Sequence, residues 1–139
     1  MTRLTLIRGL PGSGKTTLAK SIIITAKHRL NWVHFEADQY FIQPTGEYNF
    51  DKTKLGEAHN WCLSQTNIAL FEYKNVIVSN TFTTKKELRP YFNLAKHYDI
   101  IPVVIICQNQ FESIHDVPSE TIERMKSRFQ YNIDELFNK

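Results

Sequence analysis

One motif near the start of the chain restricts the possible folds more than any other feature. Residues 9–16 read Gly-Leu-Pro-Gly-Ser-Gly-Lys-Thr and match the pattern GxxxxGK[ST] at every fixed position. An apolar run at 4–7 precedes the loop, and a segment with helical spacing begins at Lys15. A chance glycine-rich turn is the alternative, but a strand, this loop and a helix in that order favour a site for the phosphates of a nucleoside triphosphate.

The residue types of this loop suit a bound triphosphate. Glycines allow backbone N–H groups to turn towards phosphate oxygens, and the helix that starts here adds its own unpaired N–H groups. Lys15 would place its charge on the β- and γ-phosphates, and the Thr16 hydroxyl would ligate Mg²⁺. We expect the nucleotide to be held by Gly9, Pro11, Gly12, Ser13, Gly14, Lys15, Thr16 and Thr17.

Apolar strand-like runs alternate with helical patterns along the whole chain. Strands are expected at 4–7, 32–35, 76–78 and 100–107. Helices are expected at 15–29 and 51–73. A third helix should follow a cap at Thr83 or Thr84, and a fourth should begin with Pro118 as its first residue. Such alternation requires crossover connections. The sequence therefore predicts an α/β, three-layer P-loop NTPase fold, with a mostly parallel central sheet of four or five strands, helices on both faces and a single domain over 1–139.

Composition and charge exclude several classes of protein. A chain of 139 residues with 42% apolar and 22% charged residues is ordinary for a globular domain, and the formal charge of +3 permits a polyanionic partner without predicting one. Cys62 and Cys107 are far apart, so we expect two buried thiols in a reducing, cytoplasmic compartment. The first residues do not resemble a signal peptide, no apolar run is long enough to span a bilayer, and no oligomer is implied.

Polar residues follow the expected strands, where ligands of parallel sheets bind. Asp38 comes after the strand at 32–35 and could take the proton of an acceptor hydroxyl, with a helix N-cap as the alternative. Glu36 lies two residues earlier and could point elsewhere. Asn80 ends a Walker B-like strand where an acid would hold the water shell of the metal; alternatively, Asn80 and Thr81 are ordinary cap and turn residues.

The segment at 108–118 is expected to form a lid over the site. Arginines usually clamp the transferring phosphoryl group, but the nearest ones here are Arg124 and Arg128, four residues apart on one helical face. They either reach the nucleotide or form a solvated face. His115 lies in the lid, where a hinge or packing role is the simpler interpretation.

Over almost its whole length the chain resembles the polynucleotide-kinase-like branch of P-loop phosphotransferases, which carries an AAA-type ATP-binding domain. This branch includes the kinase domain of bacteriophage polynucleotide kinase and the NEDD4-binding-protein-2-like proteins. The resemblance lies in residues 8–19, 37–41, 46–50, 57–62, 76–81 and 115–118, with Ile122, Arg124, Met125 and Arg128. The first block is shared by many P-loop proteins, and the last is far more specific.

The resemblance implies a kinase that uses ATP and Mg²⁺ to phosphorylate a 5′-hydroxyl of single-stranded nucleic acid or a similar small hydroxyl. It also implies that Asp38 is the general base. The chain departs from the family in having Asn80-Thr81-Phe82 for Asp-Thr-Asn, and Glu112 near the position of a lid arginine. A nucleotide-dependent binding module or weak ATPase, and a small-metabolite kinase, therefore remain alternatives.

Overall fold

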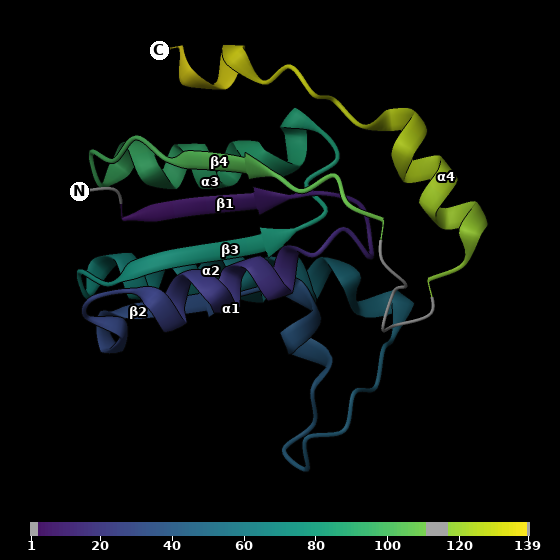
Figure 1. Ribbon diagram of the computed structural model, residues 1–139, viewed down its shortest axis with the longest axis horizontal. Coiled ribbons are helices and arrows are strands. Elements are labelled where there is room, and N and C mark those ends of the chain that lie inside the picture. The colour runs from purple at the N-terminus through teal and green to yellow at the C-terminus, as the bar shows by residue number, and fades with distance from the viewer. Residues whose placement is uncertain (1–2, 111–116, 139) are drawn as a thin grey trace.

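Four parallel strands form the sheet of this protein, in the order β2-β3-β1-β4 (Figure 1). The computed structural model describes residues 3–110 and 117–138. The strands are β1 (Leu4–Arg8), β2 (Trp32–Phe35), β3 (Asn75–Asn80) and β4 (Val103–Ile106). β3 and β1 lie in the centre, where a strand is covered on both faces, and Val76, Ile77 and Val78 of β3 are fully buried. The expected parallel α/β sheet is confirmed.

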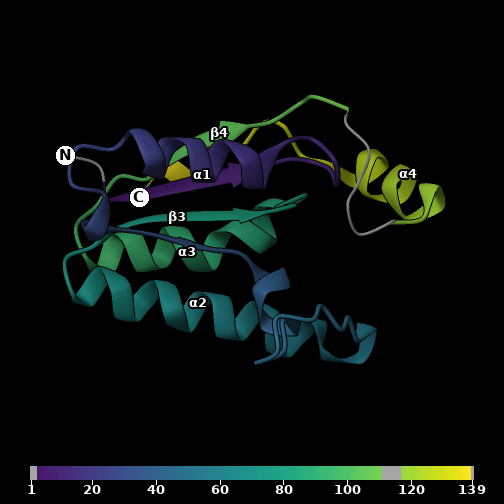
Figure 2. The same ribbon diagram turned by 60° about the horizontal axis from the view of Figure 1, so that its bottom comes forward.

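Helices cover both faces of the sheet and make three layers (Figure 2). α1 (Lys15–Thr25) packs on one face against Ile7 and Ile77. α2 (Leu55–Phe71) and α3 (Lys85–His97) pack on the other face, where Leu6 and Val78 are fully buried. The two sets of strand residues alternate along β1 and β3, because successive side chains of a strand point to opposite faces.

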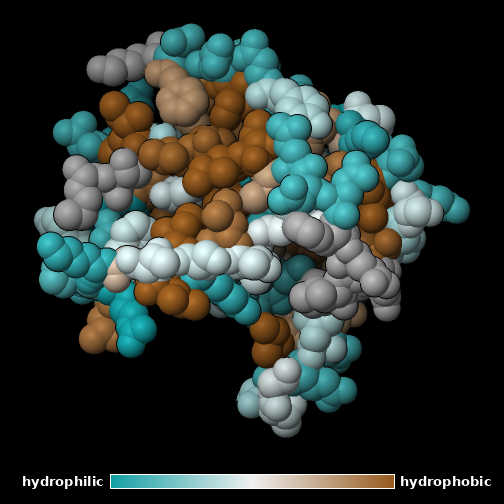
Figure 3. All heavy atoms as spheres, viewed as in Figure 1, coloured by the Kyte–Doolittle hydropathy of each residue, from teal (hydrophilic) through white to brown (hydrophobic). Residues whose placement is uncertain are grey.

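The face that carries α1 is covered less completely than the other. Apolar side chains gather over β1 and β4 in Figure 3, beside α1. Val103 of β4 is 42% exposed, while Ile105 and Cys107 are half-buried against the α1 cluster. Cys62 is buried as expected, but the expectation of a buried Cys107 was wrong because the edge of the sheet leaves it half-buried.

Several boundaries differ from the sequence predictions. α1 ends at Thr25 instead of residue 29, and the following 29–31 segment is a separate 3-10 turn. α2 is preceded by a 3-10 turn, Lys52–Lys54, and ends at Phe71. Tyr73 does not continue its apolar face: it is 82% exposed and has a positive φ of 60°. Spacing alone could not show this, because Tyr73 keeps helical register with Ala69 after the helix has ended.

Proline and threonine explain the ends of other elements. β4 starts at Val103 and not at residue 100, because Pro102 has no N–H to donate to a ladder. Thr84, one of the two expected caps, begins α3 in a capping box with Glu87. Pro118 is the N-cap of α4 (Ser119–Arg128) and not its first helical residue, because its extended ψ of 142° lies outside the helical region.

The chain closes with a short 3-10 helix, Asp134–Phe137, that packs on α3 through the Phe92 and Phe137 rings. None of the helices that the structure describes combines the length and the apolar character needed to cross a bilayer.

Candidate functional site

The glycine loop joins the carboxyl end of β1 to the first turn of α1. Gly12 and Gly14 have positive φ angles of 81° and 94°, a conformation that L side chains rarely adopt. Gly9 is needed for a different reason: a Cβ there would lie 2.5 Å from the carbonyl oxygen of Cys107 and 2.5 Å from Ser13 Oγ. The loop therefore needs glycine at all three of these positions.

The polar groups of the loop fit an anion. Lys15 Nζ donates to the Leu10 carbonyl at 3.0 Å, within the loop. Burial lowers the pKa of Lys15, and the charges of Glu36, Cys107 and Asp38 act in the opposite direction. Ser13 Oγ is buried and has no hydrogen-bond partner among the described residues. A phosphate oxygen would satisfy this hydroxyl and the free helical N–H groups of α1.

A carboxylate accepts a hydrogen bond from the Thr16 hydroxyl, and it belongs to Glu36, for which the sequence indicated no role. Glu36 Oε2 accepts hydrogen bonds from Thr16 Oγ1 at 2.8 Å and from Ser79 Oγ at 3.0 Å. His34 Nε2 lies 2.6 Å from Ser79 Oγ. Burial lowers the pKa of His34, while Glu36 acts to raise it.

Strand register explains why these side chains meet. β2 and β3 are paired so that His34 lies beside Ile77 and Phe35 beside Val78, which brings the next residues, Glu36 and Ser79, together. Ile77 points towards α1, so by alternation His34, Glu36 and Ser79 do so as well. Alternation therefore identifies Glu36 once Ile77 is known to face α1, but the sequence alone does not show which face Ile77 occupies.

Asn80 points to the opposite face of the sheet, away from the Thr16 hydroxyl. Its Oδ1 accepts from the backbone N–H of Ala37 at 2.8 Å, and its Nδ2 donates to Cys62 Sγ of α2 at 3.7 Å. Asn80 thereby connects β3 to the turn that follows β2. The structure does not bring Asn80 together with Thr16, so a metal role for Asn80 has no support from this geometry.

Asp38 lies in the first turn of the 3-10 helix Ala37–Phe41, directly beyond β2. It is half-buried, and Glu36, not Asp38, occupies the N-cap position of this helix. The Tyr48 hydroxyl donates to Asp38 Oδ1 at 3.4 Å. Burial first, and then the charge of Asp38, raises the pKa of Tyr48 to about 12.

The two arginines of α4 are exposed and bonded to threonines. Arg124 Nη2 donates to Thr121 Oγ1 at 3.2 Å, within its own helix, and Arg128 Nε donates to Thr83 Oγ1 at 3.2 Å. Figures 1 and 2 place α4 beyond the carboxyl ends of the strands, on the side of the phosphate loop. Glu112 and His115 lie outside the described residues.

The candidate site offers oxygen atoms that could bind Mg²⁺ together with the nucleotide. Within 3–110 and 117–138, no three His, Cys, Asp or Glu side chains gather as a metal site. Mg²⁺ in nucleotide sites uses one or two protein oxygens together with phosphates and water. Thr16 Oγ1 and the Glu36 carboxylate, 2.8 Å apart, fit that pattern.

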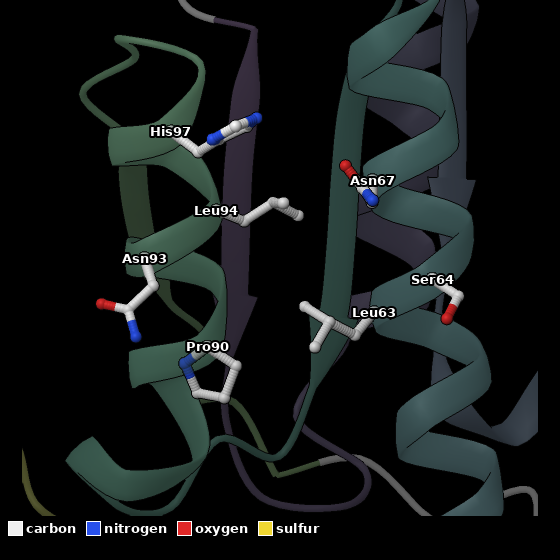
Figure 4. Close-up of a pocket in the computed structure, with 7 residues that line it drawn as sticks. All are labelled: Leu63, Ser64, Asn67, Pro90, Asn93, Leu94 and His97. Atoms are coloured by element: carbon white, nitrogen blue, oxygen red, sulfur yellow. The ribbon is translucent and has the colours of Figure 1, made fainter.

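The surface of the described residues has two open hollows, one of them next to the phosphate loop. One of about 500 Å³ lies beside the phosphate loop, lined by Gly14, Thr17, Leu18, Ser21 and Asn109. The other, of about 370 Å³, lies between α2 and α3 (Figure 4). It is lined by Leu63, Ser64, Asn67, Pro90, Asn93, Leu94 and His97. The first hollow adjoins the loop and is the one that belongs to the candidate site.

Comparison with known proteins agrees with this geometry. A family model described as an AAA domain matches residues 4–131. The chain belongs to this family. This AAA domain is 35% identical over 142 residues to human NEDD4-binding protein 2, and the match covers 91% of the chain but 8% of that protein. The resemblance to polynucleotide-kinase-like P-loop proteins is confirmed.

Solved structures show the same fold. The structure of the Pnkp1/Rnl/Hen1 RNA repair complex matches with a TM-score of 0.70 and 20% identity, over 97% of this chain and 46% of that one. The Mycobacterium tuberculosis APS kinase CysC in complex with AMPPNP and APS matches with a TM-score of 0.54 and 15% identity, over 88% and 67%. The AAA domain therefore has a P-loop kinase-like fold.

Proposed function

We propose that this domain is an ATP- and Mg²⁺-dependent phosphotransferase that moves the γ-phosphate to a hydroxyl of a nucleic-acid 5′ end or a nucleotide-like acceptor. The observation that carries the proposal is positional: Lys15 follows the loop after β1, and Asp38 lies in the first turn beyond β2, so both come just after the carboxyl ends of parallel strands. A phosphate-binding cation and a half-buried carboxylate thus share one edge of the sheet. This is the pairing that phosphoryl transfer to a hydroxyl needs.

Each residue has a defined part in the transfer. The acceptor oxygen forms a bond to the γ-phosphorus as the bond from that phosphorus to the β–γ bridging oxygen breaks, and ADP leaves. Asp38 takes the proton of the acceptor hydroxyl. Lys15 and the N–H groups of the loop bind the β- and γ-phosphates, and Thr16 would hold Mg²⁺, which neutralises phosphate charge when bound.

The positive clamp is proposed to come from α4. Arg124 and Arg128 stand one helical turn apart, beyond the carboxyl ends of the strands. Their partners are the neutral hydroxyls of two threonines, at 3.2 Å each. A phosphate oxygen would be a stronger, charge-assisted partner for either arginine than the hydroxyl it now contacts.

The acceptor is inferred from the relatives. A neighbour in an RNA repair complex supports a nucleic-acid 5′ end. A small-molecule acceptor is the second candidate, because the APS kinase neighbour is seen with AMPPNP and APS. A cytoplasmic location and a single domain over 1–139 remain predictions.

The test is transfer of labelled γ-phosphate from ATP to a short single-stranded oligonucleotide with a 5′-hydroxyl, in the presence of Mg²⁺. Asp38→Asn should abolish transfer and leave ATP affinity, measured by calorimetry, nearly unchanged. Asp99→Asn is the matched control, because Asp99 is exposed between α3 and β4, at the opposite end of β4 from the site. Transfer at a similar rate in Asp38→Asn would show that Asp38 is not the base.

Lys15→Ala separates binding from transfer. It should weaken ATP binding about tenfold or more, since hydrogen bonds to charged groups contribute roughly 1.5–3 kcal/mol. Lys20→Ala, at an exposed position of the same helix, should leave binding unchanged. ATP binding without transfer to the oligonucleotide would exclude that acceptor and favour a small-molecule kinase or a nucleotide-dependent binding module.

A further inference from the structure

The end of β3 lacks the negative charge that a Walker B strand normally brings to its metal. Mg²⁺ in P-loop NTPases is held by the Ser or Thr of the loop and by an aspartate of that strand. The β3 residue that faces Thr16 here is Ser79, which is neutral, and Asn80 points to the other face. A carboxylate must therefore come from elsewhere if the metal is to be held in the same way.

Resting on the proposed function, we infer that Glu36, directly after β2, replaces the missing Walker B carboxylate and positions Thr16 for Mg²⁺. Glu36 Oε2 is the shared acceptor of the Thr16 and Ser79 hydroxyls, at 2.8 and 3.0 Å. The carboxylate thus follows the neighbouring strand β2, and the β3 residue beside it is the hydroxyl-bearing Ser79. This exchange keeps one carboxylate in the space between β2, β3 and the start of α1.

The hydrogen bond from Thr16 to Glu36 orients the Thr16 hydroxyl for a cation. A threonine hydroxyl has one proton and two lone pairs. Because its proton is donated to Glu36, both lone pairs of Thr16 Oγ1 remain available for a cation. The same carboxylate would place a negative charge near a cation bound at Thr16 and could accept a hydrogen bond from metal-bound water.

Ser79 and His34 hold the Glu36 carboxylate in place through a chain of hydrogen bonds. Ser79 donates its single proton to Glu36, so the 2.6 Å contact requires His34 Nε2 to be the donor to Ser79 Oγ. The His34 side chain is 9% exposed and that of Glu36 is 20% exposed. Glu36 is thus fixed from behind and keeps a partly open side, as a metal ligand or a holder of metal-bound water needs.

The decisive measurement is the gain in affinity for a non-hydrolysable ATP analogue when Mg²⁺ replaces EDTA. We expect Glu36→Gln to reduce this gain about tenfold or more, the usual effect of losing a group that supports a metal ligand. Affinity in EDTA should stay the same or rise, because a negative charge is removed near the phosphates. Glu47→Gln, an exposed acid-to-amide change in the turn beyond the 3-10 helix Ala37–Phe41, should change neither quantity.

A rescue variant separates a metal role from a structural one. Glu36→Gln combined with Ser79→Asp returns the carboxylate to β3 and should restore the Mg²⁺-dependent gain. An unchanged gain in Glu36→Gln would overturn the inference. So would an equal loss of affinity in Mg²⁺ and in EDTA that Ser79→Asp does not repair, since that pattern describes a structural residue.

The two proposals fail in different ways. A normal Mg²⁺-dependent gain that Glu36→Gln reduces, with no phosphate transfer to any hydroxyl, would leave the role of Glu36 intact and reject the kinase. Transfer that is lost in Asp38→Asn, with a Mg²⁺-dependent gain that is the same in Glu36→Gln, would support the kinase and reject the role of Glu36.

Discussion

The guanidinium of Arg8 lies over the ring of Phe129, 4.3 Å from its centroid. Arg8 ends β1 and is fully buried. Its Nε and Nη2 donate to the carbonyl of Phe82 at 3.0 and 2.8 Å, and Nη2 also donates to the carbonyl of Gln130 at 2.7 Å. One side chain therefore joins the central strand to the segment after β3 and to the residues that follow α4.

Replacing this side chain should destabilise the protein strongly. Arg8→Met keeps much of the apolar volume but leaves the carbonyls of Phe82, which is buried, and of Gln130, which is exposed, without their donor. An unpaired buried acceptor costs about 1–3 kcal/mol. The stacking on Phe129 is lost as well. We expect the free energy of unfolding, measured with urea, to fall by about 3 kcal/mol or more.

Arg29→Met is the control for this measurement. Arg29 begins an exposed 3-10 turn after α1, so its loss should change the free energy of unfolding by no more than about 0.5 kcal/mol. Equal stability of the two variants would show that the Arg8 contacts contribute little.

The sequence predicted the parts of the fold that depend on local chemistry. The phosphate loop requires glycine where the backbone turns or approaches a neighbour, and Gly12 and Gly14 do have positive φ. The apolar run of β3 indicates a central strand, and Thr84 followed by Glu87 indicates a capping box. These signals lie within a few residues of one another.

The contacts that were not predicted depend on strand order and on distant segments. Asn80 was expected at the metal because it ends β3, but the face of a strand residue is known only once its neighbours are assigned to a layer. Ile77 packing on α1 places Ser79 and Glu36 on that side. The pairing of Arg8 with Phe129 joins residues at opposite ends of the chain, and no local pattern indicates it.

Gly9→Ala should disturb the phosphate loop. The added Cβ would lie 2.5 Å from a backbone oxygen, that of Cys107, which cannot move aside as a flexible side chain would. Forcing an extra methyl into a close-packed site costs typically about 1–3 kcal/mol. We expect a loss of stability in this range and weaker ATP binding, measured by thermal unfolding and by calorimetry.

Gly56→Ala makes the same chemical change where there is space. Gly56 lies in the first turn of α2, and a Cβ there would meet nothing within 4 Å. Alanine favours a helix over glycine by up to about 1 kcal/mol, so this variant should be as stable as the parent or more stable. A Gly9→Ala variant as stable as Gly56→Ala would mean that the close approach at Gly9 is relieved by movement of the loop.

The titration of Tyr48 reports on the charge of Asp38. Burial is the main cause that raises the pKa of Tyr48 to about 12, and the Asp38 carboxylate adds to it because a negative charge opposes formation of the phenolate. Asp38→Asn removes that charge but not the burial. We expect the pKa of Tyr48 to fall in this variant, yet to remain above the ordinary tyrosine value of about 10.

Carbon-13 NMR of the tyrosine rings can follow this change, with Tyr48→Phe to assign the signal. In the parent protein the Tyr48 ring should stay protonated as the pH is raised to 11, and in Asp38→Asn it should begin to titrate below that pH. Asp99→Asn lies at the other end of β4 and should leave the Tyr48 signal unchanged. The same pKa in the parent and in Asp38→Asn would place the Asp38 charge away from Tyr48 and would remove the geometric basis for Asp38 as the base.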